Sequence, residues 1–203
     1  RAVSTLKART FARPTSPNID AFARDAVAFT QLMPQSSWTK PSVASLLTSR
    51  YPQVHGAEDR PDVLRDGLPS IATELTGQGY ACQGLVTNAN ILPLFGFGDG
   101  FERFVDVDAS DTVNCDDAKV IDKSIAAAAS LAGRPWFLYA HLMGPHDPYD
   151  PPHNYGTEFR RQSYADTDAG RRQKAVDLYD GEILYSDAQV GRLFDALREQ
   201  GQY

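Results

Sequence analysis

Two stretches of the sequence join a helix to a strand across a short turn that contains glycine, and this repeat constrains the fold most. The first runs from a helix over 69–75 into a strand over 80–86. The second runs from an Ala-rich helix over 118–131, which Gly133 ends, into a strand over 135–140. Glycine often ends a helix, and a helix that leads directly into a strand is half of a βαβ unit. The sequence therefore predicts an α/β fold with a mostly parallel sheet.

The strand over 135–140 is continuously apolar, which predicts burial on both faces between layers of helices. Further expected elements are a helix that starts at Ser16-Pro17, a strand over 27–30, a helix over 42–48 and a long helix over 171–199. Loops are expected over 34–41, 52–68, 87–117 and 142–170. Ligands of open α/β sheets bind at the carboxyl ends of the strands, so the residues after Thr30, Val86 and Ala140 are the first candidates for a site.

Charge and hydropathy exclude several classes of function. The net charge of −6 argues against nucleic-acid binding, because that binding depends on neutralising phosphates. No run of eighteen apolar residues is present, so no membrane span is predicted in the segment. The first fifteen residues carry four basic side chains and no acidic one, which predicts a solvated basic arm. Cys82 and Cys115 lack zinc-ligand spacing, and either buried thiols or one disulfide would fit them.

The segment Ser36–Ser42 brings several hydroxyl groups to the start of a predicted helix. The N-terminus of a helix attracts negative charge, so an anion can bind there, and an activated hydroxyl can act as a nucleophile. Ordinary capping of the helix by Ser or Thr is the alternative.

A second motif, over 141–153, follows a strand directly and combines His and Asp with several prolines. Its histidines can transfer protons or bind an oxyanion, and a rigid, solvated surface turn explains the pattern equally well.

Two other segments have simpler interpretations. Gly96–Phe101 resembles a phosphate-binding loop, but no helix and no Lys-Ser/Thr follow, so a structural turn is expected. The aspartates over 106–117 lack the spacing of an EF-hand and predict a solvated acidic loop rather than a calcium site.

Taken together, the motifs resemble the sulfatase branch of the alkaline phosphatase superfamily. The matching segments occur in the family's order over almost the whole chain: Ser16–Asp20, Ala28–Thr30, Thr39–Pro52 with His55-Gly56, Phe95–Asp106, Phe137–Pro152, and Tyr179–Glu182 with Asp187. This resemblance implies an alkaline-phosphatase-like three-layer α/β/α sandwich and hydrolysis of sulfate or phosphate esters.

The resemblance also implies roles for individual residues. Thr39 occupies the position of the nucleophile, which is a Cys or Ser oxidised to formylglycine in sulfatases. Threonine has no route to formylglycine, but phosphoesterases and phosphoglycerol transferases of the superfamily use Thr directly. The family's motif Arg is Val43 here. His146 matches a histidine that contacts the anion, and it is expected to contact the transferred group or donate a proton.

Further residues are expected to bind the substrate. Asn88 and Asn90 replace a Lys and a His of the family and can still donate hydrogen bonds to an oxyanion, more weakly than charged groups do. Lys40 is a possible extra cation, and His141 is a further candidate.

The family's metal, a divalent ion such as Ca²⁺, Mg²⁺, Mn²⁺ or Zn²⁺, would contact Thr39. Its other ligands belong to an Asp pair and an Asp-His or Asp-Asn pair that do not occur in residues 1–203. We therefore expect residues 1–203 to be the N-terminal portion of a larger catalytic domain, inactive on its own.

The expected partner is a small-molecule sulfate or phosphate ester, and the family resemblance favours an extracytoplasmic location. Two alternatives stay open. One is a phosphodiesterase or a phosphoglycerol-transferase-like enzyme of the same superfamily, and the other is a non-catalytic binding domain.

Overall fold

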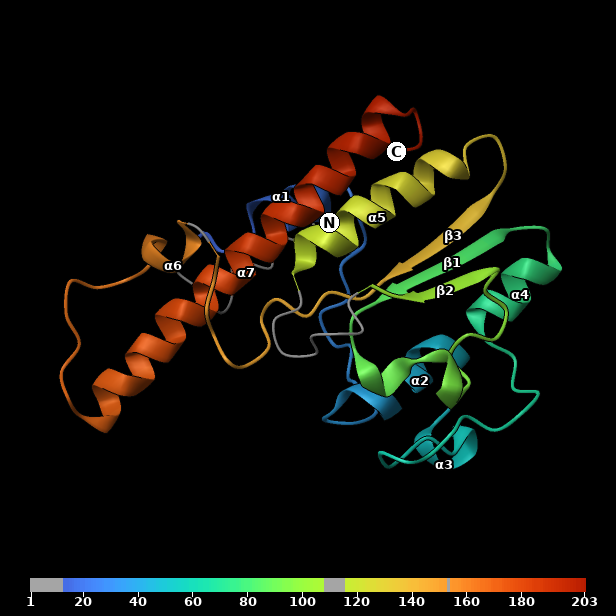
Figure 1. Ribbon diagram of the computed structural model, residues 1–203, viewed down its shortest axis with the longest axis horizontal. Coiled ribbons are helices and arrows are strands. Elements are labelled where there is room, and N and C mark those ends of the chain that lie inside the picture. Colours follow the sequence, from blue (N-terminus) through green and yellow to red (C-terminus); the bar gives the residue numbers. More distant parts are fainter. Residues whose placement is uncertain (1–12, 108–115, 153) are drawn as a thin grey trace.

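A parallel sheet of three strands lies between two layers of helices in the computed structural model, which describes residues 13–107, 116–152 and 154–203 (Figure 1). The strands are β1 (Ala81–Val86), β2 (Arg103–Asp106) and β3 (Trp136–Ala140), in the spatial order β2-β1-β3. The helices are α1 (Pro17–Ala23), α2 (Thr39–Thr48), α3 (Pro52–His55), α4 (Ile71–Gly77), α5 (Asp117–Ser130), α6 (Tyr155–Glu158) and α7 (Asp168–Glu199), with 3-10 turns η2 (Ala89–Ile91) and η3 (Pro93–Phe95). The predicted α/β fold with a parallel sheet is confirmed.

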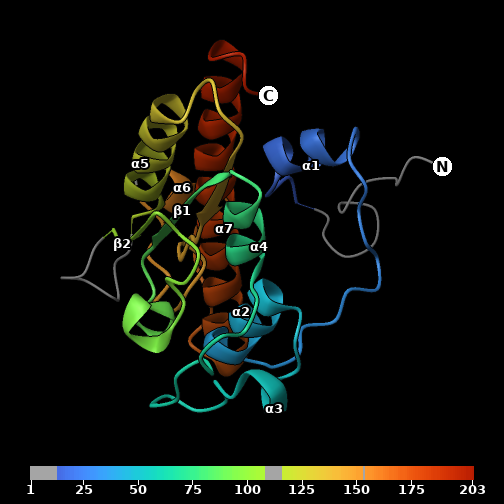
Figure 2. The ribbon, with the colours of Figure 1, turned by 90° about the vertical axis from the view of Figure 1, so that its right-hand side faces the viewer.

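The strands form two cores because their side chains alternate between the faces of the sheet. Phe104 and Tyr139 are both in register with Gly84, and they pack with Val86 against α2. The next row, Val105, Leu85 and Ala140, packs on the opposite face against α5. Figures 1 and 2 show α5 and α7 over one face of the sheet and α2 and α4 over the other. The expected three layers therefore follow from the two-residue period of each strand.

Burial of the strands differs from the expectation. Every residue of β3 is only half-buried, whereas β1 is buried at all positions except Gln83. The prediction that β3 is buried on both faces is wrong, because β1 is the central strand among the described residues and β3 lies at the edge of their sheet. The continuous apolar pattern of β3 did not distinguish an edge from a centre.

Two other strand assignments are corrected. The segment over 87–117 was expected to be a loop, yet Arg103–Asp106 forms β2, whose four residues include a charge at each end. The expected strand over 27–30 is absent, and Val27 and Phe29 are largely exposed. A strand needs a hydrogen-bonded neighbour, and no described strand pairs with this segment.

Helix α1 is capped by a residue far away in the sequence. Ser16 precedes the helix as expected, but its side chain makes no capping hydrogen bond. The fully buried carboxylate of Asp187, on α7, accepts hydrogen bonds from the backbone N–H groups of Asn18 (2.9 Å) and Ile19 (2.8 Å). It also accepts one from the side-chain amide of Asn18 at 2.8 Å. A negative charge at the N-terminus of a helix is favourable, so Asp187 fixes α1 against α7.

A second contact holds the N-terminal segment on α7. Arg13 lies 2.7 Å from both Asp177 and Asp180, two buried carboxylates of this helix. The guanidinium lowers the pKa of Asp177. Arg13 is therefore not part of a solvated arm; the other basic residues of that arm, Arg1, Lys7 and Arg9, lie outside the described residues.

Replacement of Asp187 by alanine should destabilise the fold by about 3 kcal/mol, because it leaves the N–H groups of Asn18 and Ile19 without an acceptor. Asp195→Ala is the matched control, since Asp195 is an exposed aspartate of α7 whose one ion pair within residues 13–107, 116–152 and 154–203 is with Arg198 at the surface. It should change stability by no more than about 0.5 kcal/mol. Urea unfolding of both variants tests this, and equal losses would contradict the capping role of Asp187.

Candidate active site

The carboxyl ends of the strands bring several predicted residues together. The chain beyond β3 stays on the sheet, because the His141 N–H donates to the Leu85 carbonyl at 2.9 Å. The side-chain amide of Asn88 lies 3.3 Å from the sulfur of Met143, and the Asn88 oxygen accepts two hydrogen bonds from Asn90. The loops after β1 and β3 are thus in direct contact, as expected for an α/β site.

His141 is held as a neutral imidazole. Its Nδ1 lies 2.9 Å from the hydroxyl of Tyr139, and burial lowers the pKa of His141 to about 4. Burial also raises the pKa of Tyr139, so this hydroxyl keeps its proton and donates it to Nδ1. The proton of the imidazole is then on Nε2, which makes His141 a hydrogen-bond donor rather than a cation.

Thr39 is the first residue of α2, although the helix was expected to begin after Pro41. Trp38 occupies the N-cap position and makes no side-chain capping bond. The hydroxyl of Thr39 is not used as a cap, and within the described part of the chain it has no hydrogen-bond partner. The capping alternative therefore fails for this residue. The half-buried Thr39 offers a hydroxyl at the end of the helix that favours an anion.

Helix α2 is placed by its buried side. Val43 and Ala44, one turn after Thr39, pack with Val86 and Ile91, and η2, which contains Asn90, lies against α2. The absence of the family's motif Arg at position 43 is thereby explained structurally, because Val43 lies in the core. Thr39 and Asn90 thus belong to elements that pack together.

Lys40 does not fit the expected role of an oxyanion donor. Its side chain is fully buried, and its ammonium donates to the carbonyls of Arg60 (2.5 Å) and Asp62 (2.9 Å). The same nitrogen lies 3.3 Å from the centre of the Phe95 ring. A cation placed in this way anchors the start of α2 to the following loop. Its pKa is lowered by burial.

His55, from the His-Gly pair of the motif, has a similar structural role. Its Nδ1 accepts the Ala57 N–H at 3.1 Å, so Nε2 carries the proton that faces the Ser45 oxygen at 3.1 Å. Burial lowers the pKa of His55, which keeps the ring neutral. This contact joins α2 to α3.

His146 is exposed on the loop after β3. Its Nδ1 donates to the carbonyl of Asp147 at 2.7 Å, which leaves Nε2 available to a substrate. The described contacts do not bring His146 against Asn88, Asn90 or His141. His153, the last histidine of the motif, lies outside the described residues.

The residue that positions this loop is Asp117, which the sequence analysis placed in a solvated acidic loop. Asp117 is buried, and its carboxylate accepts the N–H groups of Met143 and Gly144, each at 3.0 Å, and the hydroxyl of Ser186 at 2.5 Å. Asp116 caps α5 and accepts the Tyr185 hydroxyl. The solvated interpretation is wrong for both; Asp108 and Asp111 lie outside the described residues. Their position at the start of a helix was the signal, since aspartate is a preferred N-cap and acidic residues are favoured in the first turn.

The remaining sequence features behave as expected or cannot be followed. Gly96 and Gly100 have positive φ angles of 86° and 84° around the buried Phe97, which confirms a structural turn. Cys82 is a buried free thiol, and Cys115 lies outside the described residues. No helix in the described part of the chain is long and apolar enough to cross a membrane.

The described side chains do not form a complete metal centre. No group of three or more His, Cys, Asp or Glu residues in the described ranges is arranged to hold a metal ion. Thr39 supplies at most one ligand, so a resident metal does not fit this set of residues alone.

The described structure thus combines a parallel sheet between helices with the hydroxyl of Thr39 at the start of α2 and polar groups at the carboxyl ends of the strands. The sulfatase family model matches residues 3–203, and the chain belongs to the sulfatase family. Comparison with curated proteins finds no match.

Solved structures share this fold. The C-terminal periplasmic domain of EcEptC from Escherichia coli, in complex with Zn, aligns with a TM-score of 0.68 and 18% identity, over 93% of this chain and 54% of that one. The lipoteichoic acid synthase LtaP from Listeria monocytogenes aligns with a TM-score of 0.63 and 19% identity, over 83% of this chain and 42% of that one. The phosphonate monoester hydrolase SpPMH from Silicibacter pomeroyi aligns with a TM-score of 0.62 and 18% identity, over 80% of this chain and 50% of that one. The chain spans about half the length of these structures.

The state of His141 predicts a pH dependence of stability. Because its folded pKa is about 4 and an unfolded histidine titrates near 6.5, the unfolded chain takes up the proton first. The stability from His141 is complete above about pH 6.5 and is lost as the pH falls toward 4.

Between pH 7.5 and 5, the wild type should lose about 1–2 kcal/mol more than His141→Gln, which has no titrating ring. The buried Glu182 contributes with the opposite sign, since its pKa is raised to about 7, but it is present in both proteins and cancels. Urea unfolding at the two pH values is the measurement. Equal losses of stability in the wild type and His141→Gln would show that His141 does not cause this pH dependence.

Proposed function

We propose that this chain is the N-terminal portion of a sulfatase-family hydrolase that cleaves sulfate or phosphate esters with Thr39 as the nucleophile. The observation that carries this is the hydroxyl of Thr39, half-buried at the first residue of α2 and without a partner among the described residues. Membership of the sulfatase family supports the reaction class. The periplasmic origin of the EcEptC domain supports an extracytoplasmic location for this protein too.

In this proposal the oxygen of Thr39 attacks the sulfur or phosphorus, and the hydroxyl proton passes to solvent. The bond to the ester oxygen breaks, and that oxygen takes a proton from Nε2 of doubly protonated His146, which regains the proton from solvent before the next turnover. Water then hydrolyses the ester on Thr39 and restores the hydroxyl. The N–H groups at the start of α2, the amides of Asn88 and Asn90, and Nε2 of His141 stabilise the negative charge that develops on the transferred group. Lys40 is excluded from this set by its buried carbonyl contacts.

A divalent metal belongs to the proposal as a cofactor held largely by residues outside 1–203, with Thr39 as one ligand. The zinc in the EcEptC complex supports this assignment. No step above depends on the metal, because the described residues do not form its site.

Phosphate chemistry, including group transfer by a phosphodiesterase or phosphoglycerol-transferase-like enzyme, is the second candidate. It is favoured by threonine at position 39, which cannot form formylglycine, and by the similarity to a lipoteichoic acid synthase.

Replacement of Thr39 tests the nucleophile in the gene product that contains this chain. Thr39→Ala should reduce turnover of 4-nitrophenyl sulfate or 4-nitrophenyl phosphate by at least about 10⁴-fold, because no other hydroxyl takes its place. Thr39→Ser keeps the hydroxyl and should retain measurable turnover. The two substrates distinguish sulfate from phosphate chemistry. Wild-type rates in Thr39→Ala would refute the assignment, and inactivity of the wild type on every ester would favour a binding domain.

Metal binding tests the proposal that most ligands of the metal lie outside residues 1–203. Isothermal titration of residues 1–203 with Mn²⁺ or Zn²⁺ should show no saturable site at micromolar concentration, and the chain should not hydrolyse aryl esters. A chelator should inactivate the gene product that contains the chain. Metal-dependent hydrolysis by residues 1–203 alone would overturn this proposal.

A further inference from the structure

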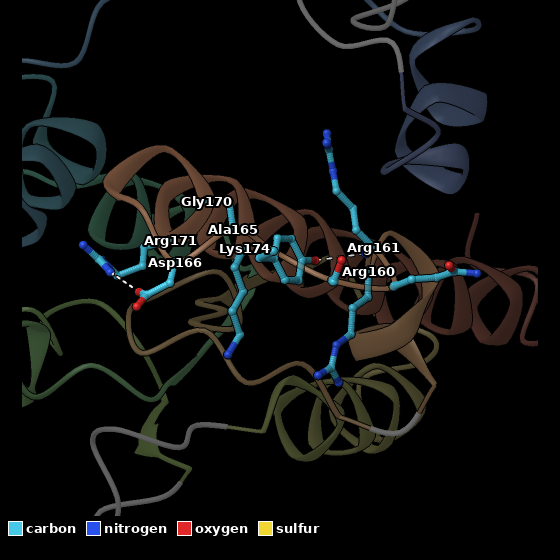
Figure 3. A pocket seen from close by; sticks show the side chains of 10 residues that line it. Arg160, Arg161, Ala165, Asp166, Gly170, Arg171 and Lys174 are labelled. Atoms are coloured by element: carbon cyan, nitrogen blue, oxygen red, sulfur yellow. Dashed lines mark hydrogen bonds and ion pairs between the residues drawn. The ribbon is translucent and has the colours of Figure 1, made fainter.

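A basic groove lies apart from the candidate active site, where the chain passes from α6 into α7. It is a hollow of about 380 Å³ lined by residues 160–166 with Gly170, Arg171 and Lys174. The hollow is larger than one tetrahedral anion needs and falls within the usual size range of ligand sites. Figure 3 shows the lining side chains, with Arg160 and Lys174 extended in the same direction.

The charge of the groove is opposite to that of the chain. Four of its lining residues are basic and one, Asp166, is acidic, whereas the whole chain carries −6. Arg171 is paired with Asp166 and Asp168, and Arg161 lies 3.6 Å from Asp177. Arg160 and Lys174 have no side-chain partner among the described residues. Two free cations facing one hollow favour an anion with several oxygens.

The walls of the groove are held by a contact to the buried Asp177 as well as by contacts at the surface. The hydroxyl of Tyr164 donates to Asp177 at 2.9 Å and accepts the N–H of Arg161 at 3.0 Å. Asp177 is itself bound to Arg13. Thr167 caps the start of α7 by accepting the N–H of Gly170. The backbone that carries Arg160 and Lys174 is thereby fixed to α7.

The chain between α6 and α7, which lines the groove, lies on the side of the molecule toward which the strands run (Figure 1). The loop that carries His146 leaves β3 at its carboxyl end and leads into α6, and Arg160 follows two residues after this helix. The loop that carries His146 and the residues that line the groove therefore follow one another along the chain, separated by α6.

We propose that this groove binds a second sulfate or phosphate group of the substrate whose ester Thr39 attacks. The preferred substrate is an extended chain that carries several such groups. This inference rests on the proposed function for the identity of the reacting ester, but the anion binding itself does not depend on Thr39.

Equilibrium binding tests the groove directly. The probes are a sulfated dextran oligosaccharide, linear polyphosphate and unsulfated dextran, each titrated calorimetrically at one fixed ionic strength. R160Q/K174Q should weaken binding of the charged probes about tenfold, and unsulfated dextran should not bind. The control R24Q/R172Q removes two exposed cations outside the groove and should stay within about twofold of the wild type. Arg172 is two residues from Lys174 on the same helix, so the control tests position rather than charge.

Kinetics of the gene product that contains the chain complete the test. R160Q/K174Q should raise KM for the preferred charged probe and leave kcat, and KM for a 4-nitrophenyl ester, unchanged. The proposal for the groove would be overturned if R160Q/K174Q and R24Q/R172Q bound the charged probes equally well. An unchanged KM of R160Q/K174Q for the charged probe would also overturn it. Thr39→Ala separates the two proposals: if it still turns over substrate, the proposed function fails, while anion binding that depends on Arg160 and Lys174 would still establish the groove as an anion site.

Discussion

Buried carboxylates on α7 hold together segments that are distant in the sequence, and the rest of the structure depends on them. Asp187 caps α1, Asp177 and Asp180 bind Arg13, and Glu182 accepts the N–H of Asp150 at 2.9 Å. Each carboxylate replaces water with specific donors from another segment, which is the condition for burying a charge. One long helix thus positions both the segment over 13–19 and the loop that follows β3.

This arrangement has an electrostatic cost. Burial raises the pKa of Glu182 to about 7 and also raises those of Asp117 and Asp180. One oxygen of Asp180 is buried without a hydrogen-bond partner in the described structure. These acids gain most of their support from backbone N–H groups, hydroxyls and a single arginine, so their protonation and the packing of α7 are coupled. The helix that organises the fold therefore also carries two acids, Asp180 and Glu182, whose pKa values are raised by burial.

The fold was predictable where local rules coincide with the tertiary structure. The two helix-to-strand units were predicted correctly because glycine ends a helix through its own backbone conformation, whatever the tertiary packing. Gly79 and Gly133, which follow the two helices, both have positive φ. The strand predictions that failed concern segments whose structure depends on neighbouring strands in the sheet. The segment over 27–30 has the composition of a strand but no partner, β2 is too short for a pattern, and β3 lies at the edge of the described sheet. At the candidate site, motif positions indicated Thr39 and the Asn88–Asn90 pair, whose roles stay predictions, whereas the burial of Lys40 and Asp117 depends on contacts that no spacing shows.

In the candidate site, the groups that could contact substrate differ from the residues that hold their segments in place. Its polar groups come from separate segments, and each segment has its own buried anchor: Lys40 for the start of α2, Tyr139 for His141, and Asp117 for the loop over 143–144. Each anchor uses its polar atoms on the protein, whereas the hydroxyl of Thr39 and Nε2 of His141 have no hydrogen-bond partner among the described residues. The position of a charged residue next to a proposed nucleophile, as Lys40 is next to Thr39, is then not evidence that the charged residue contacts substrate. What decides the role is whether its hydrogen-bonding capacity is already satisfied inside the fold, and by that criterion Thr39 is available and Lys40 is not.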